Sequence, residues 1–410
     1  MDSIDRDRAR QMLRDARDAG KKYYYDPKDH GIDLDARYQQ FDERIKAATS
    51  LNEGLRMVAA FLSGLNDSHT FFEPPERPYR LDTGFRMQLF GENAFVTRVR
   101  PGTDAESKVH AGDQVVAYDT YSVNRVDFHD LSYNFNSLMP QVKTQLDLRD
   151  PDGNVRRVMV DSRMQQGRKT LDFASGADIA QYIRAQENED HVVRQRYVET
   201  GDEMIWKMPE FFLDDSAVDH LFGVVRKHKT LILDLRGNPG GAEVTLERMV
   251  ANVFDHDVKI SDRIGRKELK PVLAKTVGER AFGGKIIVLV DSQSASAAEL
   301  FARVTQLENR GIVLGDRTSG SVMEARGYRY SQGADTIIEY GFSVTEADLI
   351  MKDGKSLEHV GVTPDEIINP TGHDLAMGQD PVLARAVELA GGKLDPVEAG
   401  KLFPFEWLPF

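Results

Sequence analysis

Two short segments place small residues and hydroxyl groups where an apolar run gives way to a helical pattern. The first is Leu-Asp-Leu-Arg-Gly-Asn-Pro-Gly-Gly at 233–241. Glycines let the backbone turn sharply and aim N–H groups into a cleft, and N–H groups at a helix start suit developing negative charge. A purely structural strand-to-helix turn would use the same residues, so this segment alone leaves both interpretations open.

The second segment is Asp-Ser-Gln-Ser-Ala-Ser-Ala-Ala-Glu-Leu-Phe at 291–301. A serine at a strand-to-helix elbow is exposed at the edge of a sheet, and the next N–H lies where an oxyanion forms. Ser292, Ser294 and Ser296 are equally good helix caps, which is the structural alternative. The two segments together indicate acyl chemistry at a serine more specifically than either does alone.

Buried strands must carry both segments. The apolar runs at 231–236 and 285–291 are short and continuous, and helical patterns follow around 242–254 and 296–308. Such runs are typical of parallel strands covered on both faces. The alternation predicts an α/β core whose functional groups gather at the carboxyl ends of the strands.

The first 75 or so residues have a helical pattern, with apolar residues such as Met12, Ala16 and Ala19 at helical spacing. The proline-rich stretch at 73–79 indicates a rigid linker. Between about 80 and 162, short alternating segments separated by turn residues predict a small β-rich module. The segments are Phe-Arg-Met-Gln-Leu-Phe, Ala-Phe-Val-Thr-Arg-Val-Arg, Gln-Val-Val-Ala-Tyr-Asp, Thr-Gln-Leu-Asp-Leu-Arg-Asp and Val-Arg-Arg-Val-Met-Val.

Composition narrows the function classes. The net charge is −13 and the sequence pI is near 5.3, which argues against a nucleic-acid-binding protein because that function needs a basic face. The chain has no cysteine, so disulfides, thiolate metal sites and a cysteine nucleophile are excluded. We also expect no metal site, since no familiar ligand spacing occurs. The charged N-terminal segment is no signal peptide and no stretch is long enough to span a bilayer, so we expect no stable membrane insertion.

The β-rich module resembles a PDZ domain. Thr83, Gly84 and Phe85 precede a strand, and Val-Arg-Pro-Gly-Thr-Asp-Ala-Glu-Ser-Lys-Val-His-Ala-Gly-Asp-Gln follows at 99–114. The resemblance implies a loop at Gly84 and Phe85 that binds a terminal carboxylate, beside an exposed strand edge that pairs with a peptide. A β module that only spaces its neighbours is the alternative.

Taken together, the two chemical segments resemble the C-terminal-processing and tricorn-like serine peptidases. The resemblance implies a helical N-terminal region at 1–78, a PDZ-like domain at 79–163 and an α/β core of the crotonase-like ββα type at 164–410. It implies Ser296 as the nucleophile, with Glu299 supporting the elbow. The implied oxyanion donors are the N–H groups of Ala297 and of Gly240 or Gly241.

One departure from the family bears on the base. The bacterial C-terminal-processing branch carries a lysine base after the nucleophile, and the aligned position here is Ser321. A serine hydroxyl cannot act as that base. His69, in Asn-Asp-Ser-His-Thr, instead resembles the histidine base of the tricorn-like branch, in which Ser68 and Glu358 would complete a tetrad. His359 is the competing base.

These features predict a serine endopeptidase, or a tail-specific protease, that cleaves peptides or unfolded protein segments through an acyl-enzyme without a cofactor. The alternative is an inactive relative that binds peptides or apolar ligands. An oligomer is compatible with either, and the compartment is left open: cytoplasmic if the chain is intact, exported if a signal was removed. The apolar tail at 402–410 either covers the core or docks at the PDZ-like loop.

Overall fold

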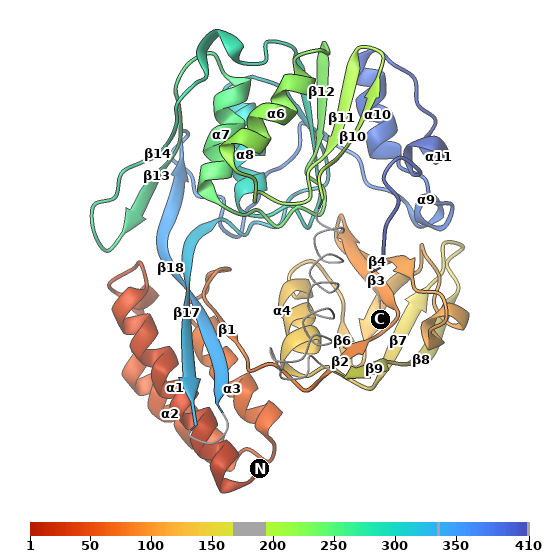
Figure 1. Ribbon diagram of the computed structural model, residues 1–410. Helices are drawn as coiled ribbons and strands as arrows, with labels where there is room; N and C mark the ends of the chain where they lie inside the picture. Colours follow the sequence, from red (N-terminus) through yellow and green to blue (C-terminus); the bar gives the residue numbers. More distant parts are fainter. Residues whose placement is uncertain (167–193, 334–336, 408–410) are drawn as a thin grey trace, which may run out of the picture.

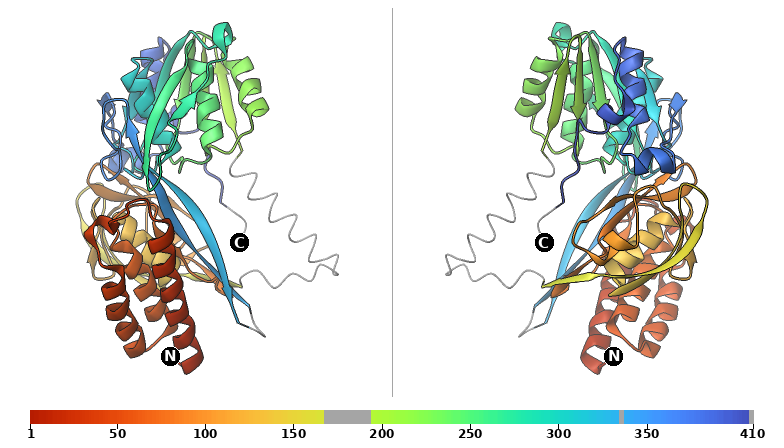
Figure 2. Two further views of the ribbon diagram at one scale, coloured as in Figure 1. Left: turned by 90° about the vertical axis from the view of Figure 1, so that its left-hand side faces the viewer. Right: turned by 90° about the vertical axis from the view of Figure 1, so that its right-hand side faces the viewer.

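The computed structural model describes residues 1–166, 194–333 and 337–407. Figure 1 shows an α/β body above two smaller bodies, a helical one and a β-rich one, with one long hairpin running between the α/β body and the helices. The α/β class expected from the sequence is confirmed, and the two views of Figure 2 show the same arrangement from the sides.

The α/β body is built on a six-stranded sheet in the order β10-β11-β12-β15-β16-β19. Strand β10 is antiparallel to β11, and the other neighbours are parallel. Helices α6, α7 and α8 cover one face and α10 covers the other. The bounds are β10 Arg196–Thr200, β11 Glu203–Lys207, α6 Asp215–Val225, β12 Thr230–Asp234, α7 Glu243–Val253, β15 Lys285–Val290, α8 Ala297–Leu307, β16 Ile312–Gly315, β19 Glu366–Ile367, α9 Gly372–Ala376, α10 Pro381–Ala390 and α11 Pro396–Ala399.

Strand β12 shows why these apolar runs are continuous. Leu231 and Leu233 pack on the side of α7 and α8, whereas Ile232 packs on the side of α10. All five residues of β12 are buried. Alternate side chains of a strand point to opposite faces, so a strand covered on both faces needs apolar residues throughout.

The helical body consists of α1 (Ser3–Tyr23), α2 (Leu34–Ala47) and α3 (Leu51–Ser63). Side chains of Asp2, Asp33 and Ser50 cap the three N-termini by accepting backbone N–H bonds. The apolar residues of α1 and α3 are buried against one another. The helical pattern predicted for this region is therefore present, and its core supports the segment that follows α3.

A second sheet connects the helices to the α/β body. Its order is β1-β18-β13-β14, with β17 also paired to β18. At one end of β18, Tyr340 and Phe342 join the core of the helical body, and at the other end Leu349 and Met351 join the α/β core. The bounds are β1 Phe71–Glu73, β13 Val258–Gly265, β14 Val272–Ala274, β17 Met323–Gln332 and β18 Ile338–Met351.

The β-rich body is a sheet in the order β3-β4-β5-β7-β8, with β6 paired to β5 and a separate β2–β9 pair. Strand β3 begins and ends at the residues expected from the alternation, and its neighbours differ by one residue at most. The pattern missed the helix α4 (Phe128–Tyr133), whose apolar content is too short to show a period. The bounds are β2 Tyr79–Asp82, β3 Phe85–Phe90, β4 Asn93–Val99, β5 Gln114–Tyr118, β6 Tyr121–Ser122, β7 Lys143–Arg149, β8 Val155–Asp161 and β9 Arg163–Gln166.

Candidate active site

Ser296 lies at the turn between β15 and α8 and has a strained backbone. Its φ is 53° and its ψ is −118°. A positive φ is uncommon for a residue with a Cβ and costs of order 1–3 kcal/mol unless the surroundings enforce it. This geometry is that of a nucleophile elbow, in which the turn itself presents the serine hydroxyl.

Glu299 holds that elbow in place. Its buried carboxylate accepts hydrogen bonds from the N–H groups of Ser296 (3.1 Å), Gly320 (2.8 Å) and Ser321 (3.0 Å), and from the hydroxyl of Thr318. Burial raises the pKa of Glu299 to about 7, although these donors act in the opposite direction. The glutamate therefore ties the elbow to the 318–321 segment, which agrees with the supporting role expected for it.

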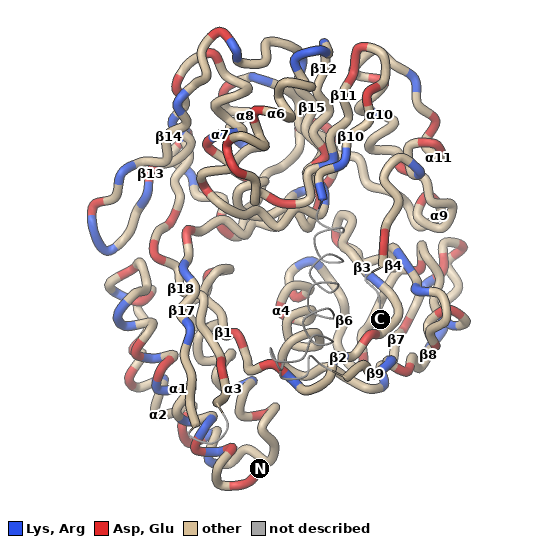
Figure 3. Tube along the Cα trace, in the orientation of Figure 1, with Lys and Arg blue, Asp and Glu red and all other residues tan. Residues whose placement is uncertain are grey.

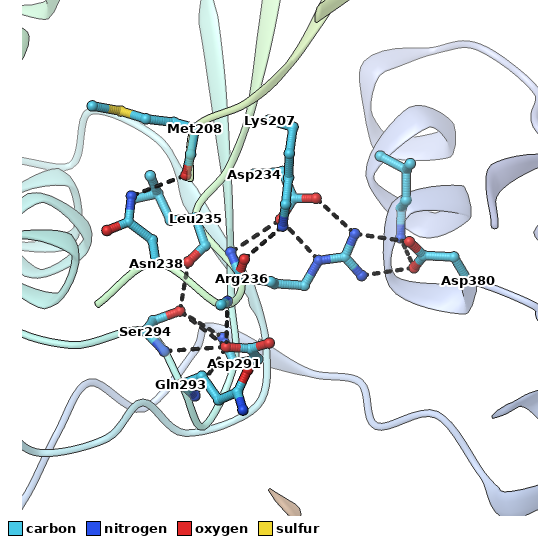
Figure 4. A network of polar contacts seen from close by, with 12 residues as sticks. Lys207, Met208, Asp234, Leu235, Arg236, Asn238, Asp291, Gln293, Ser294 and Asp380 are labelled. Atoms are coloured by element: carbon cyan, nitrogen blue, oxygen red, sulfur yellow. Dashed lines mark hydrogen bonds and ion pairs between the residues drawn. The ribbon is translucent and has the colours of Figure 1, made fainter. Parts of the chain in front are cut away.

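Ser292 and Ser294, which precede Ser296, both donate hydrogen bonds to backbone carbonyl groups. The Ser294 hydroxyl donates to the carbonyl of Leu235 at 2.8 Å and accepts from the N–H of Asp291 at 2.9 Å. Asp291 in turn accepts from the N–H of Gly237 at 2.9 Å. Figure 4 shows that these bonds join the ends of β12 and β15. The Ser292 hydroxyl donates to the Leu89 carbonyl of the β-rich body.

A charged network beside these bonds fixes the end of β12. Arg236 binds Asp234 and Asp380, and Lys207 lies 3.2 Å from Asp234 (Figure 4). Burial alone would raise the pKa of Asp234, but Arg236 and Lys207 hold it well below its ordinary value. The carboxylate is therefore charged at neutral pH, and it anchors the start of the glycine-rich turn.

The glycine-rich turn lies directly against the elbow. A Cβ at Gly240 would lie 2.6 Å from Cβ of Ser296 and 3.0 Å from N of Ala297, so only glycine fits. The Gly240 N–H donates to Asn238 Oδ1 at 2.8 Å and is committed to the turn. In the described part of the chain, the N–H groups of Gly241 and Ala297 show no such partner. Among the expected oxyanion donors, the N–H groups of Gly241 and Ala297 are therefore the ones left available to a ligand.

His69 lies in a turn between α3 and β1 that Asp67 organises. The Asp67 carboxylate accepts from the N–H groups of His69 (3.0 Å) and Thr70 (2.7 Å) and from the hydroxyl of Thr345 on β18 (2.5 Å). The Thr345 N–H donates to the Thr70 hydroxyl at 3.0 Å. Sequence reasoning missed the role of Asp67, although an aspartate two residues before the fixed group is the signature of an Asx turn.

Ser68 and Glu358 gather around the same histidine. Nδ1 of His69 lies 2.8 Å from the Ser68 hydroxyl, which donates to Glu358 at 2.9 Å. Glu358 also accepts from the N–H groups of Ser68 (2.6 Å) and Val322 (2.9 Å). Because the Ser68 hydroxyl gives its proton to Glu358, it accepts from Nδ1–H, which leaves Nε2 of His69 as a free acceptor.

The surroundings also set the charge of the imidazole. Burial lowers the pKa of His69 below its ordinary value, and the nearby charges of Glu358 and Asp67 oppose this only in part. The ring is therefore neutral at neutral pH, which is the state that a general base requires.

No hydrogen bond between His69 and Ser296 is present among the described residues. The connection runs through Ser321, whose carbonyl accepts from the Ser296 N–H at 2.9 Å and whose hydroxyl lies 3.5 Å from Nδ1 of His69. Catalytic bonds are often long before substrate binds. The competing base His359 is exposed, and its Nε2 lies 2.9 Å from the carbonyl of Asn66.

The two residues expected to bind peptide, Gly84 and Phe85, already make contacts within the β-rich body. The Gly84 N–H donates to Asp82 Oδ1 at 2.9 Å, and its carbonyl accepts from the N–H of Arg100 at 2.7 Å. The Phe85 ring belongs to the core of the β-rich body. A carboxylate approaching this loop would have to displace the Asp82 side chain to reach the Gly84 N–H.

Comparisons with known proteins bear on the segments that carry these residues. The sequence profile of peptidase family S41 matches residues 205–368. These matched residues are called the S41 region below. The S41 region includes Ser296, Glu299 and Glu358, whereas Ser68 and His69 lie before it.

Relatives extend the similarity beyond the S41 region. The chain is 24% identical over 94% of its length to a protein of Sulfurisphaera tokodaii described as a tricorn-like protease C-terminal subunit, and it covers 43% of that protein. It is 30% identical over 162 residues, 39% of the chain, to a tricorn protease homolog of Streptomyces coelicolor, of which it covers 13%. The chain thus spans less than half the length of either relative.

The fold is similar to that of mature CPAF. The TM-score is 0.66 at 17% identity, and the match covers 91% of this chain and 95% of the other. Within residues 1–166, 194–333 and 337–407, no group of three or more histidine and carboxylate side chains could hold a metal ion. In the same residues, we find no helix whose length and apolar character would let it cross a membrane.

Proposed function

We propose that the chain is a serine endopeptidase in which Ser296 is the nucleophile and His69 the general base. The observation that carries the proposal is the strained Ser296 elbow, which packs against Gly240 and shares Ser321 with the Glu358–Ser68–His69 relay. Strain at a serine whose turn is held by a buried glutamate serves presentation of the hydroxyl rather than stability.

In the proposed reaction, each of these residues has one role. Nε2 of His69 takes the proton of the Ser296 hydroxyl as its oxygen attacks the scissile carbonyl. The N–H groups of Gly241 and Ala297 stabilise the oxyanion of the tetrahedral intermediate. Its collapse breaks the C–N bond, and His69 passes the proton to the leaving amine. Water, deprotonated by the same imidazole, then hydrolyses the ester and restores Ser296.

Ser68 and Glu358 orient the base in this scheme. The chain Nδ1–H to Ser68 to Glu358 fixes the tautomer of His69 and stabilises its charged form during proton transfer. In this proposal, the helical region at 1–78 supplies the base and the module at 79–163 binds the peptide. Residues 164–410 form the peptidase core. The proposed substrate is a peptide or an unfolded protein segment.

Labelling with a fluorophosphonate probe tests the proposal. The wild-type protein should form a covalent adduct at Ser296 and hydrolyse an unfolded protein, whereas Ser296→Ala should do neither. Ser292→Ala is the matched control, because the Ser292 hydroxyl donates a hydrogen bond to the Leu89 carbonyl. This variant should still be labelled. Folded protein that takes up no label would overturn the proposal in favour of a non-catalytic peptide-binding protein.

A further inference from the structure

Three arginines lie together on the hairpin that opens the β-rich body. Arg86 on β3 is directly opposite Arg98 on β4, and Arg100 follows two residues later. Residues two apart along an extended chain point to the same side. Like charges placed opposite each other across two strands repel. This set, Arg86, Arg98 and Arg100, is called the arginine strip below.

The end of the chain covers the arginine strip. The guanidinium carbon of Arg100 lies 4.4 Å from the ring centroid of Trp407, and that of Arg86 lies 5.7 Å from it. The guanidinium carbon of Arg98 lies 5.9 Å from the ring centroid of Phe405. The chain crosses from α11 to the β-rich body to reach this place, as Figures 1 and 2 show, and Figure 3 marks basic positions on β3 and β4 near it.

Residues 402–407 divide into a part that packs on the α/β body and a part that does not. Leu402 and Phe403 pack against the cluster beneath α10. Phe405 is 45% exposed, and its ring meets the Trp407 ring edge-on with centroids 5.0 Å apart. Core packing therefore explains Leu402 and Phe403, whereas charge and aromatic contact account for the residues beyond them.

Glu406 adds charge complementarity between the two rings. Its carboxylate accepts from Arg194 at 3.0 Å, and the neighbouring Pro404 carbonyl accepts from Arg196 at 2.9 Å. Arg194 and Arg196 precede or open β10, so the segment lies between basic groups from two bodies. Guanidinium groups stack on aromatic faces and pair with carboxylates, and such contacts are individually weak at exposed positions.

We propose that the arginine strip, together with Arg194, is a binding surface for peptide segments in which two aromatic residues flank an acidic one, and that Phe405–Glu406–Trp407 occupies it until such a segment displaces it. The strip borders the Thr83–Phe85 loop, because Arg100 also pairs with Asp82 at 2.7 Å. The role of the strip in selecting substrates rests on the proposed peptidase function, but binding itself does not.

Trp407 reports on this displacement. The chain has two tryptophans, and Trp206 is fully buried in the core. The difference between the emission of the full chain and that of its Trp407→Phe variant isolates the Trp407 signal, and Ser296→Ala in both prevents cleavage. Titration with the blocked peptide Phe-Glu-Phe should give a saturable red shift, and Phe-Lys-Phe should give none.

Variants of the strip complete the test. Arg100→Ala should shift the apparent affinity for Phe-Glu-Phe by about tenfold or more, whereas Arg157→Ala, which removes a paired arginine from β8, should leave it unchanged. An equal response to both peptides, no saturable response, or an unaffected Arg100→Ala variant would overturn the inference. Because this readout needs no cleavage, it separates the inference from the proposed activity.

A kinetic measurement addresses substrate choice. In the active protein, Trp407→Ala should lower KM several-fold for a substrate containing Phe-Glu-Phe and leave kcat unchanged. KM for a substrate with Ala-Glu-Ala should not change. Equal changes in KM for both substrates would contradict a displaceable tail at the arginine strip.

Discussion

The hydroxyl of Ser321 lies 3.5 Å from Nδ1 of His69. The resemblance to the bacterial C-terminal-processing peptidases puts Ser321 where that branch would carry a lysine, and the Ser321 carbonyl accepts a hydrogen bond from the N–H of Ser296. A histidine carried by the helical region thus reaches the neighbourhood that the lysine would occupy.

Two serines of the elbow should separate activity from stability. Ser296→Ala should lower kcat by at least about 1,000-fold and leave the melting temperature unchanged or raised, since it removes only the nucleophile. Ser294→Ala should keep most activity at low temperature but cost about 1–3 kcal/mol, because the Asp291 N–H loses its acceptor and the Leu235 carbonyl keeps only the Asn238 N–H as a donor. Thermal unfolding and peptide hydrolysis measure both; the reverse pattern would place the nucleophile elsewhere.

Loss of the base should be as damaging as loss of the nucleophile. His69→Ala should match Ser296→Ala within about tenfold in kcat/KM, and the double variant should be scarcely worse, because the two residues serve one step. Independent, additive losses would show that His69 is not the base of Ser296.

The pH profile should identify the base. Burial lowers the pKa of His69, so kcat/KM should rise with pH through one ionisation below the ordinary histidine value near 6.5 and be level at neutral pH. The Glu358→Gln variant lacks the charge that opposes this shift, so the ionisation of His69 should occur at still lower pH. An activity that appears only above about pH 9 would instead indicate a lysine base.

Ser68 and Ser321 form a matched pair around Nδ1. Ser68 lies 2.8 Å from it and relays to Glu358, whereas Ser321 lies 3.5 Å away. Ser68→Ala should therefore reduce kcat by roughly 10- to 100-fold, and Ser321→Ala by only a few-fold. Steady-state kinetics at neutral pH, with circular dichroism as a control for folding, decide between them. Equal losses would mean that Ser68 is no special relay.

Glu299 should give stability a distinct pH dependence. The raised pKa, about 7 against 4.5, means that the folded state holds an extra proton between these values, so wild-type stability falls as pH rises through that window. The Glu299→Gln variant lacks this pH-dependent loss of stability, but its side chain cannot accept hydrogen bonds from all four donors. The variant should therefore have a lower unfolding free energy than the wild type, and this difference should shrink by up to about 3 kcal/mol between pH 4.5 and 7. A deficit that does not vary with pH would show that Glu299 stays charged.

The sequence predicts well what depends on local periodicity. The apolar runs around Leu233 and Val288 became adjacent parallel strands, and the alternation at Phe85–Phe90 became β3. The sequence does not predict contacts between residues that are far apart along the chain. Ser68 and Glu358 are 290 positions apart, and only resemblance to a family suggested that they meet. The positive φ of Ser296 was also beyond reach, because serine has no local preference for it and Glu299 and Gly240 impose it.

The tail shows a different limit. An apolar C-terminal run favours burial, and Leu402 and Phe403 follow that rule. Phe405 stays exposed, and both Phe405 and Trp407 contact arginines that strand pairing brings together. Hydrophobicity alone contains no information about where such cationic surfaces form.

Strand β1 and the turn before it pair with β18, a strand made near the end of the chain. During synthesis, His69 therefore emerges early but gains its place only when β18 and Glu358 have left the ribosome. A nascent chain that ends before Glu358 therefore contains His69 and Ser296 without the carboxylate to which the Ser68 hydroxyl donates. In the proposed peptidase, the orienting carboxylate is thus the last part of the site to be synthesised.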